Sequence, residues 1–475
     1  MASSDAISSG EHKKVLIITY YWPPAGGAGV QRFLKFVKYF PEYGIDPVVL
    51  TCFNPTYPMR DPTLAEDIPD GIPVHYARTV EPFGLYSLLS GTSPEKAADP
   101  TTVLGSGELG LTERLVRWLR ANIFVPDARS GWVLFARHKA RKLISEYRID
   151  TIITTGPPHS THFIGHRLKR KTGVRWIADF RDPWTDIHYN RALPRMGLTE
   201  KRDARMEARI LRTADEITVT APGTARYFSR KVDRSYHTIP NGFDPDDFPK
   251  PADRKQTRDQ SGETGPAPPF CIRHVGSITE TSVPVNLLRV LSKFPETDIR
   301  IEFIGTVHPD VQKYAAEFGL GDRIHFRSYV PHREATVLMQ EADLNLVVVH
   351  RSEDSRILIP GKLYDYLNAG KPVMVIGPSD GDTAAIVRRC RIGETFDYTD
   401  ETDPEQWLKR LIHARRTGGR PDSENYPAFA PDTREISRYS RPALTRLYAA
   451  LIQGDNFSEQ HSSGETGHPM VQNPS

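Results

Sequence analysis

The sequence has few cysteines and no long apolar run. Its 475 residues include three cysteines, Cys52, Cys271 and Cys390, which are far apart and odd in number. This spacing excludes a disulfide framework and the usual zinc-binding spacings, and it favours a reducing, cytoplasmic compartment. No stretch of about 18 apolar residues occurs, so we expect no membrane-spanning helix. The segment before Val15 also lacks the apolar core of a secretory signal peptide.

The sequence also lacks a strong excess of charge of either sign. The formal net charge is +3, with 38% hydrophobic and 25% charged residues. A nearly balanced chain does not favour nucleic acid as its partner. Because the chain is too long for a single compact core, two globular domains are expected.

Short apolar runs of strand length alternate with helical segments in both halves of the chain. Residues 30–40 have helical spacing, and the expected strands are 15–19, 47–51, 151–155, 175–179, 216–220, 271–275, 299–304, 324–326, 344–349 and 373–376. Such alternation is typical of βαβ units. The sequence therefore predicts an α/β fold with two Rossmann-like, doubly wound domains that face a central cleft.

Turn-rich and polar segments suggest where the domains divide. The segment PNGFDPDDF is followed by a polar stretch at 249–269, so we expect a first domain at 1–246 and a second at 247–430. Apolar spacing predicts a helix at 431–453 that returns to the first domain. The polar end, 454–475, is predicted to be disordered, and 55–112 is predicted to be a long loop or insertion.

Three segments that follow strands of the first half could carry chemistry. Gly26, Gly27 and Gly29 lie in the loop WPPAGGAG, where glycine allows close approach of the backbone to a phosphate or a sugar. The alternative is a plain tight turn. His159, in GPPHS, could bond a sugar hydroxyl, or it could be a cap or core residue. Arg181 and Asp182, in DFRDPW, could bind a sugar directly, or they could brace their loop.

One segment of the second half, PGKLYDYLNAGKPV, predicts a helix with a cation in its first turn. A cation there is unfavourable for the helix dipole, so Lys362 indicates an anion nearby. Asp365, one turn further on, could accept hydrogen bonds from a ribose diol. The alternative is a solvated helix face.

Taken in order along residues 13–450, the motifs resemble the retaining glycosyltransferases of family 4. The motifs are YYWPPAGGAGVQR, TTGPPHS, DFRDPWT, IPNGFD, HVGSI and PGKLYDYLNAGKPV. The resemblance implies the GT-B fold and transfer of a sugar, with retention of configuration, from a nucleotide-sugar donor to a glycan or lipid-linked acceptor. It places such a chain in polysaccharide or glycoconjugate biosynthesis and implies neither a metal nor another cofactor. The catalytic candidates are His159, Arg181 and Asp182, and the donor-binding candidates include Gly26, Gly27, Lys362 and Asp365.

The sequence departs from this family at two places. The family commonly has two glutamates eight positions apart in the last motif, where this chain has Ile357 and Asp365. A basic pair after the HVGSI-like strand is replaced by TETSV, and the nearest replacements are Lys362, Arg356 and Arg351. Arg356 is therefore also a donor-binding candidate. Two other functions stay open: a sugar-nucleotide 2-epimerase, or a non-catalytic nucleotide-sugar-binding module.

Residues 115–144 mix basic and aromatic side chains. Such a segment can lie on the anionic inner face of a cell membrane as a peripheral contact. The alternative is a helix that packs its apolar face on the sheet of the first domain.

Overall fold

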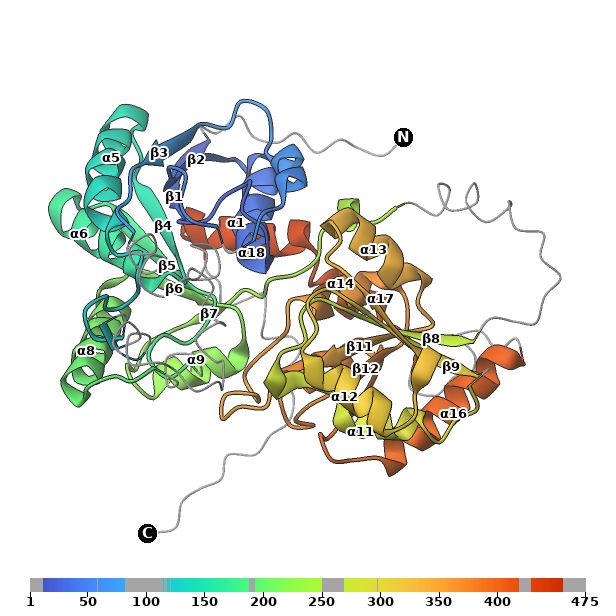
Figure 1. The fold of residues 1–475 in the computed structure, drawn as a ribbon. Coiled ribbons are helices and arrows are strands. Elements are labelled where there is room, and N and C mark those ends of the chain that lie inside the picture. The colour runs from blue at the N-terminus through green and yellow to red at the C-terminus, as the bar shows by residue number, and fades with distance from the viewer. Residues whose placement is uncertain are drawn as a thin grey trace, which may run out of the picture.

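The chain forms two parallel sheets, each with helices on both faces (Figure 1). The computed structural model describes residues 12–57, 59–81, 114, 118–119, 121–187, 193–249, 269–296, 298–417 and 429–455. The strand order is β3-β2-β1-β4-β5-β6-β7 in the first sheet and β10-β9-β8-β11-β12-β13 in the second. In both sheets the order reverses beside the first strand, so both are doubly wound. This confirms the predicted pair of Rossmann-like domains.

The central strands are the apolar runs of the sequence, and the additional strands lie at the edges. The first sheet contains β1 (Lys13–Ile18), β2 (Ile45–Cys52), β3 (Val74–Ala77), β4 (Thr151–Gly156), β5 (Arg175–Phe180), β6 (Glu216–Val219) and β7 (His237–Thr238). The second contains β8 (Phe270–Val275), β9 (Ile299–Ile304), β10 (Ile324–Arg327), β11 (Leu344–Val348), β12 (Val373–Ile376) and β13 (Gly393–Phe396). Each expected strand is present, and most of these strands are mainly apolar because helices cover both faces of the sheet.

The prediction of a loop over 55–112 is wrong in part. A 3₁₀ helix at Pro62–Asp67 and strand β3 both lie inside this segment. Strand β3 has only one buried residue, Ala77, and it pairs with the sheet on one side. An edge strand of four residues therefore has no apolar run by which to be recognised. Residues 82–112 lie outside the described part of the chain.

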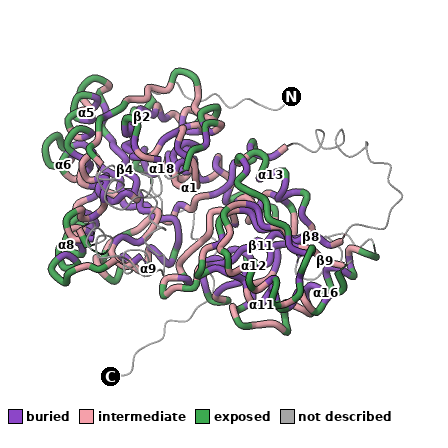
Figure 2. The backbone as a smooth tube through the Cα atoms, in the orientation of Figure 1, coloured by how far each residue is buried: buried purple, intermediate pink, exposed green. Residues whose placement is uncertain are grey.

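Helices cover each sheet in two layers. In the first domain, α1 (Ala28–Tyr39) and the C-terminal α18 lie on one face, and α5 (Trp132–Tyr147), α6 (His162–Thr172), α8 (Gly197–Thr213) and α9 (Pro222–Ser229) lie on the other. In the second, α11 (Val285–Leu291), α12 (Pro309–Glu317) and α16 (Thr402–Arg416) face α13 (His332–Glu341), α14 (Lys362–Ala369) and α15 (Asp382–Cys390) across the sheet. The sheets are buried and the outer helix faces are exposed (Figure 2).

The C-terminal segment predicted as one helix over 431–453 is divided into two. They are α17 (Thr433–Ser437) and α18 (Arg441–Gln453). Ser440 caps the second helix by accepting a hydrogen bond from the Ala443 amide, and Pro442, which has no amide proton, occupies its first turn. Helix α18 then packs on α1, where the ring of Tyr448 lies 5.0 Å from that of Phe36. The chain therefore returns to the first domain after completing the second.

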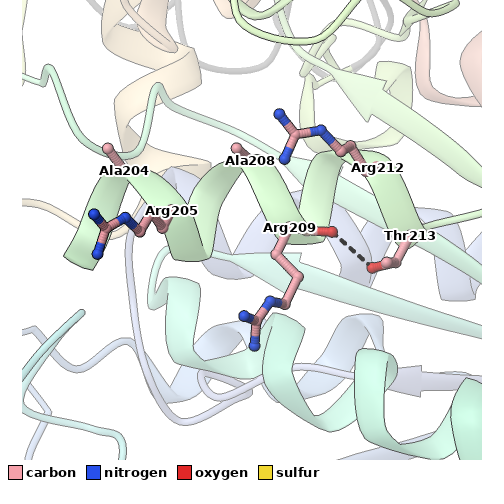
Figure 3. A pocket seen from close by; sticks show the side chains of 6 residues that line it. All are labelled: Ala204, Arg205, Ala208, Arg209, Arg212 and Thr213. Carbon is pink, nitrogen blue, oxygen red and sulfur yellow. Dashed lines mark hydrogen bonds between the residues drawn. The ribbon is translucent and has the colours of Figure 1, made fainter. Parts of the chain in front are cut away.

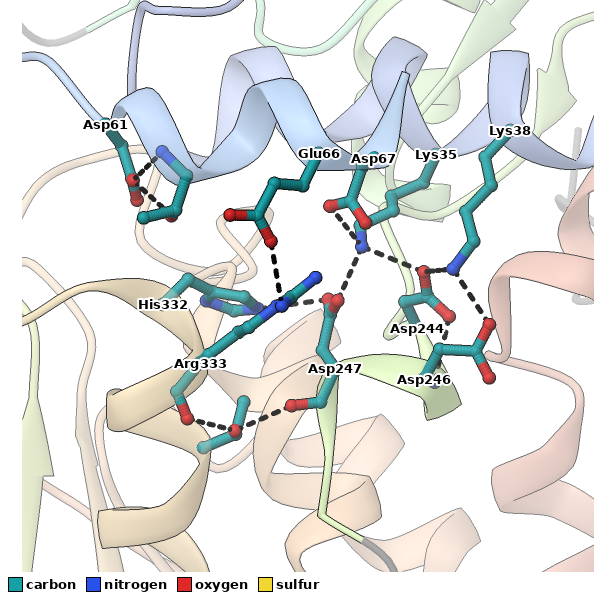
Figure 4. Close-up of polar contacts among 12 residues, drawn as sticks. Lys35, Lys38, Asp61, Glu66, Asp67, Asp244, Asp246, Asp247, His332 and Arg333 are labelled. Carbon is teal, nitrogen blue, oxygen red and sulfur yellow. Dashed lines mark hydrogen bonds and ion pairs between the residues drawn. The ribbon is translucent and has the colours of Figure 1, made fainter. Parts of the chain in front are cut away.

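A buried ionic cluster joins the first domain to the linker that leads into the second (Figure 4). The ammonium group of Lys35, on α1, lies 2.8 Å from Asp67, 2.8 Å from Asp244 and 2.5 Å from Asp247. Asp247 also lies 3.2 Å from the His332 ring of α13. Because the Lys35 side chain is only 2% exposed, its charge is compensated by these carboxylates and hardly by water.

The pKa values in this cluster report strong mutual stabilisation. Burial alone would lower the pKa of Lys35, but the carboxylates of Asp247 and Asp244 raise it above its ordinary value. Burial would raise the pKa of Asp247, but hydrogen bonding to His332 and the charge of Lys35 lower it. A lowered aspartate pKa contributes stability above the unfolded value of about 3.9, and this stability is lost as the pH falls through the folded value.

We predict that Lys35→Ala destabilises the protein by about 3–5 kcal/mol, because it leaves buried carboxylates without their cation. Urea unfolding at neutral pH measures this. Lys38→Ala is the matched control on the same helix: the Lys38 side chain is 21% exposed, its partner Asp246 is 65% exposed, and its other partner, the buried Asp244, keeps Lys35 as its cation. The control should lose about 1 kcal/mol or less. Equal losses in the two variants would contradict this account of the cluster.

Candidate functional site

A cavity of about 210 Å³ lies between the two domains. Residues of the first domain that line it follow the carboxyl ends of β4, β5 and β6, and those of the second precede and begin α14. The lining residues are Gly29, Pro157, Arg181, Asp182, Pro183, Thr220, Thr224, Asn241, Ile357, Leu358, Ile359 and Gly361. Ligands of doubly wound folds bind at this edge of the sheet, so the cavity is the candidate site.

Arg181 both lines the cavity and braces its walls. The guanidinium donates hydrogen bonds to the backbone carbonyls of Gly29, at 2.5 Å, of Gly156, at 3.3 Å, and of Pro157. A methyl group at Gly29 would lie 2.2 Å from Arg181 Nη1, so this close approach requires glycine. Asp182, beside it, also lines the cavity. The two predicted side chains therefore meet at one site, and the alternative bracing role of Arg181 is present as well.

His159 is buried next to the cavity wall and is not among the lining residues. Its ring stacks on Trp184 at 5.1 Å with an angle of 4° between the planes. The indole of Trp184 in turn donates a 2.8 Å hydrogen bond to Asp203 of α8. Burial, followed by the nearby His162 and Arg181, holds the pKa of His159 well below its usual range. The imidazole is thus a neutral ring held in a stack beside the wall residues Pro157 and Pro183.

Lys362 lies at the start of α14, beside the cavity residue Gly361. Its ammonium nitrogen is 2.7 Å from His274 Nε2, at the end of β8, and burial lowers the pKa of Lys362 to about 7. This nitrogen lies close to Gly276. A methyl group at Gly276 would be 3.0 Å from it, so the glycine leaves room for the lysine side chain. Lys362 makes no ion pair with any described residue. The amides that begin a helix and an uncompensated amine suit an anion such as a diphosphate.

The other donor-binding candidates lie away from the cavity. Asp365 lies 4.0 Å from His332, next to the ionic cluster, and burial raises its pKa to about 6. Arg356 pairs with Asp380 at 2.9 Å, and both side chains are about two-thirds exposed. Gly26 donates a hydrogen bond to the Met59 carbonyl, and Gly27 has a φ of 95°, but the glycine of this loop that reaches the cavity is Gly29.

Several lining residues were not singled out from the sequence. Thr220 and Thr224 flank the turn that begins α9, and Asn241 lies in the linker segment. Their position directly after the strand β6 and in the motif IPNGFD was the available signal. Single threonines and asparagines are too common in turns to be recognised as ligand contacts without the fold.

The described part of the basic and aromatic segment 115–144 divides between core and surface. Trp132 is fully buried against the sheet, whereas Leu134 and Phe135 of α5 are 59% and 44% exposed. Residues 115–117 and 120 lie outside the described residues. A hollow on the neighbouring helix α8 is lined by Arg205, Arg209 and Arg212 beside two alanines and a threonine (Figure 3).

None of the helices in the described residues is long and apolar enough to cross a membrane. The same part of the chain contains no group of three or more His, Cys, Asp or Glu side chains that could hold a metal ion.

Comparison with solved structures identifies the fold. The structure of Anabaena HepE in complex with UDP superposes with a TM-score of 0.60 at 14% identity, and the match covers 93% of this chain and 100% of HepE. Sucrose-phosphate synthase from Thermosynechococcus elongatus gives 0.61 at 15% identity, with 93% and 99% covered. A glycosyltransferase from Rickettsia africae gives 0.59 at 12% identity, with 94% and 99% covered. No curated protein sequence matches the chain significantly.

The two facing Rossmann-like domains with a cavity between them define a GT-B protein, as the sequence predicts. Residues 26–242 match the model of the glycosyl transferase 4-like domain. Residues 26–242 thus form a glycosyl transferase 4-like domain, which confirms the resemblance found in the motifs of this part of the chain.

Proposed function

We propose that the chain transfers a sugar from a nucleotide-sugar donor to a glycan or lipid-linked acceptor, with retention of configuration, in polysaccharide or glycoconjugate biosynthesis. The observation that carries this is the cavity between the domains, with Arg181 and Asp182 on one side and the start of α14 on the other. The HepE structures support it, since they contain UDP, UDP with glucose, or UDP-glucose.

In this proposal the two walls have separate tasks. The amides at the start of α14 and Lys362 bind the diphosphate and stabilise the charge that develops on it as the sugar leaves. The cavity holds the sugar, and Asp182 and the threonine hydroxyls orient it against the acceptor. The leaving phosphate helps to deprotonate the acceptor, so no protein nucleophile is needed. Positioning and charge stabilisation then account for the catalysis.

A sugar-nucleotide 2-epimerase is the alternative that uses the same kind of cleft. It consumes its donor without an acceptor, whereas a transferase depends on one. Donor turnover measured with and without a panel of glycan and lipid-linked acceptors separates the two. Turnover that is independent of every acceptor would favour the epimerase, and donor binding without turnover would favour a binding module.

We predict that Lys362→Met weakens binding of the nucleotide sugar about 10- to 150-fold at pH 6.5, because it removes a charged hydrogen bond to phosphate. A screen of UDP, GDP and ADP sugars by thermal shift selects the probe, and calorimetry measures its affinity. The parent binds best while Lys362 is protonated, so its affinity should fall as the pH rises above about 7, the pKa of Lys362 in the free protein. The fall is at most about tenfold per pH unit.

The variant should show no such pH dependence over the same range. Lys371→Met, at the other end of α14, is the matched control and should bind as the parent does. Parental affinity in Lys362→Met would place the diphosphate elsewhere.

We propose that His159 is a positioning residue that holds the cavity wall against the sugar. His159→Ala should then lower kcat at least about tenfold, while nucleotide affinity changes by less than about threefold, because the nucleotide is held by the second domain. His159→Phe keeps the stack on Trp184 and should recover most of the lost kcat. If the kcat of His159→Phe is as low as that of His159→Ala, the imidazole itself acts on the sugar. A lower Tm with parental kcat would make His159 part of the scaffold only.

We also propose a peripheral membrane contact through the outer face of the first domain. Helices α5, α6 and α8 together carry thirteen Lys and Arg side chains against four Asp and Glu, although the whole chain has a net charge of only +3. The exposed Leu134 and Phe135 lie within this cationic face. Exposed apolar side chains among basic ones suit an anionic lipid surface.

Sedimentation with vesicles tests this contact. Binding should require anionic phosphatidylglycerol and should weaken with salt. Each arginine at such a surface contributes about 1 kcal/mol, so replacing Arg205, Arg209 and Arg212 by glutamine should weaken binding on the order of 100-fold. Equal binding to neutral phosphatidylcholine vesicles, or no effect of the triple variant, would contradict the proposal.

A further inference from the structure

The cavity between the domains has two chemically different walls. The first domain contributes polar groups, among them Arg181, Asp182 and Asn241. The second contributes three consecutive apolar side chains, Ile357–Ile359, directly before α14. A sugar bound there meets hydrogen-bonding groups on one side and hydrocarbon on the other.

The apolar wall is held in place by packing and hydrogen bonds. A methyl group at Gly223 would lie 2.3 Å from Ile357 Cγ2, so the absence of a side chain at Gly223 makes room for Ile357. The Gly223 amide donates a 2.6 Å hydrogen bond to Asp382 of the second domain, which fixes this contact. Thr383 donates a 2.7 Å hydrogen bond to the Leu358 carbonyl. The wall is therefore a defined surface and not a loose loop.

All three apolar side chains are only partly buried, and Leu358 and Ile359 pack in part on the core of the second domain. A sugar hydroxyl facing them would lose its hydrogen bonds to water without gaining others, which disfavours it. A methyl group facing them would instead gain contact with hydrocarbon. The wall consequently selects by chemistry at one side of the sugar ring.

We propose that the transferred sugar carries a methyl group that docks on Ile357–Ile359, as in an acetamido sugar or a 6-deoxy sugar. This rests on the proposed function, because it assigns the sugar-binding part of the same cavity. An acetamido group would present its methyl to this wall beside its own amide, whereas a 6-deoxy sugar presents a ring methyl alone.

Matched donors distinguish these sources. Each set shares a nucleotide and a ring configuration: UDP-glucose with UDP-N-acetylglucosamine and UDP-6-deoxyglucose, and GDP-mannose with GDP-rhamnose. Affinities are measured by calorimetry, with bare UDP and GDP as reference ligands. At least one methyl-bearing donor should bind 10- to 200-fold more tightly than its hydroxyl-bearing partner, the range that an apolar pocket gives for one such group.

Two variants test the wall itself. Ile357→Ala and Ile359→Ala should each reduce that preference about tenfold and leave the affinity for the bare nucleotide unchanged. Leu198→Ala is the matched control, because Leu198 is a 72% exposed apolar side chain on α8 that does not line the cavity. The second wall variant keeps the test decisive if the first fails to fold, which thermal denaturation shows.

The outcomes separate this inference from the proposed function. Tight binding of a bare nucleotide diphosphate, without preference within any matched set, would overturn the methyl-binding wall alone. The same holds if the preference survives both wall variants. Failure to bind any nucleotide diphosphate would overturn the proposed function and this inference with it.

Discussion

The relation between the two domains depends on the contact of one helix with the linker. Arg32, Lys35 and Lys38 recur every three residues on α1, and all three reach the segment 240–247. Arg32 donates to the Pro240 carbonyl at 2.9 Å and is itself paired with the buried Asp179 at the end of β5. Because the charges of Arg32 and Lys35 are withdrawn from water, each needs its partner, and the path of the chain between the two sheets is fixed. The cavity follows from that path, because its two walls belong to different sheets.

The other ion pairs between the two domains are of a weaker kind. On one side Arg333 pairs with Glu66 at 2.9 Å, and both side chains are about 60% exposed. On the other side Arg226 approaches Asp382 at 3.1 Å, with Arg226 64% exposed. Exposed pairs contribute about 0–1 kcal/mol, far less than a buried cluster loses when one partner is removed. The linker is therefore the firm ionic joint between the domains, and the exposed pairs add little to the buried hydrogen bond from the Gly223 amide to Asp382 at the cavity wall.

The sequence predicts those features that depend on local pattern. Strands covered on both faces, such as β1 and β11, contain the apolar runs VLII and LVV and are recognised directly, whereas β13 reads GETF and is identified only by its pairing with β12. Arg181 is placed by its position directly after β5. The environment of Asp365 depends instead on His332, which lies on the neighbouring helix α13. Helical spacing alone cannot predict whether Asp365 faces the cavity or the ionic cluster at the linker. Tertiary packing likewise decides that Gly29, and not another glycine of its loop, lies against the Arg181 guanidinium.

In the proposed function, Lys362 makes the second domain suited to an anionic ligand such as a diphosphate. Helix α14 begins with free amides that carry a partial positive charge, and the Lys362 amine lies beside them with a neutral imidazole as its hydrogen-bond partner. Burial without a carboxylate disfavours the charged amine, which is why its pKa falls to about 7. A carboxylate at this position would stabilise the lysine, but it would also compete with any anionic ligand. An anion that enters supplies the missing counter-charge, so it gains the full interaction with a site that no protein group has neutralised. Selection for an anionic group then lies in the second domain, and the cavity is left to discriminate among the groups attached to it.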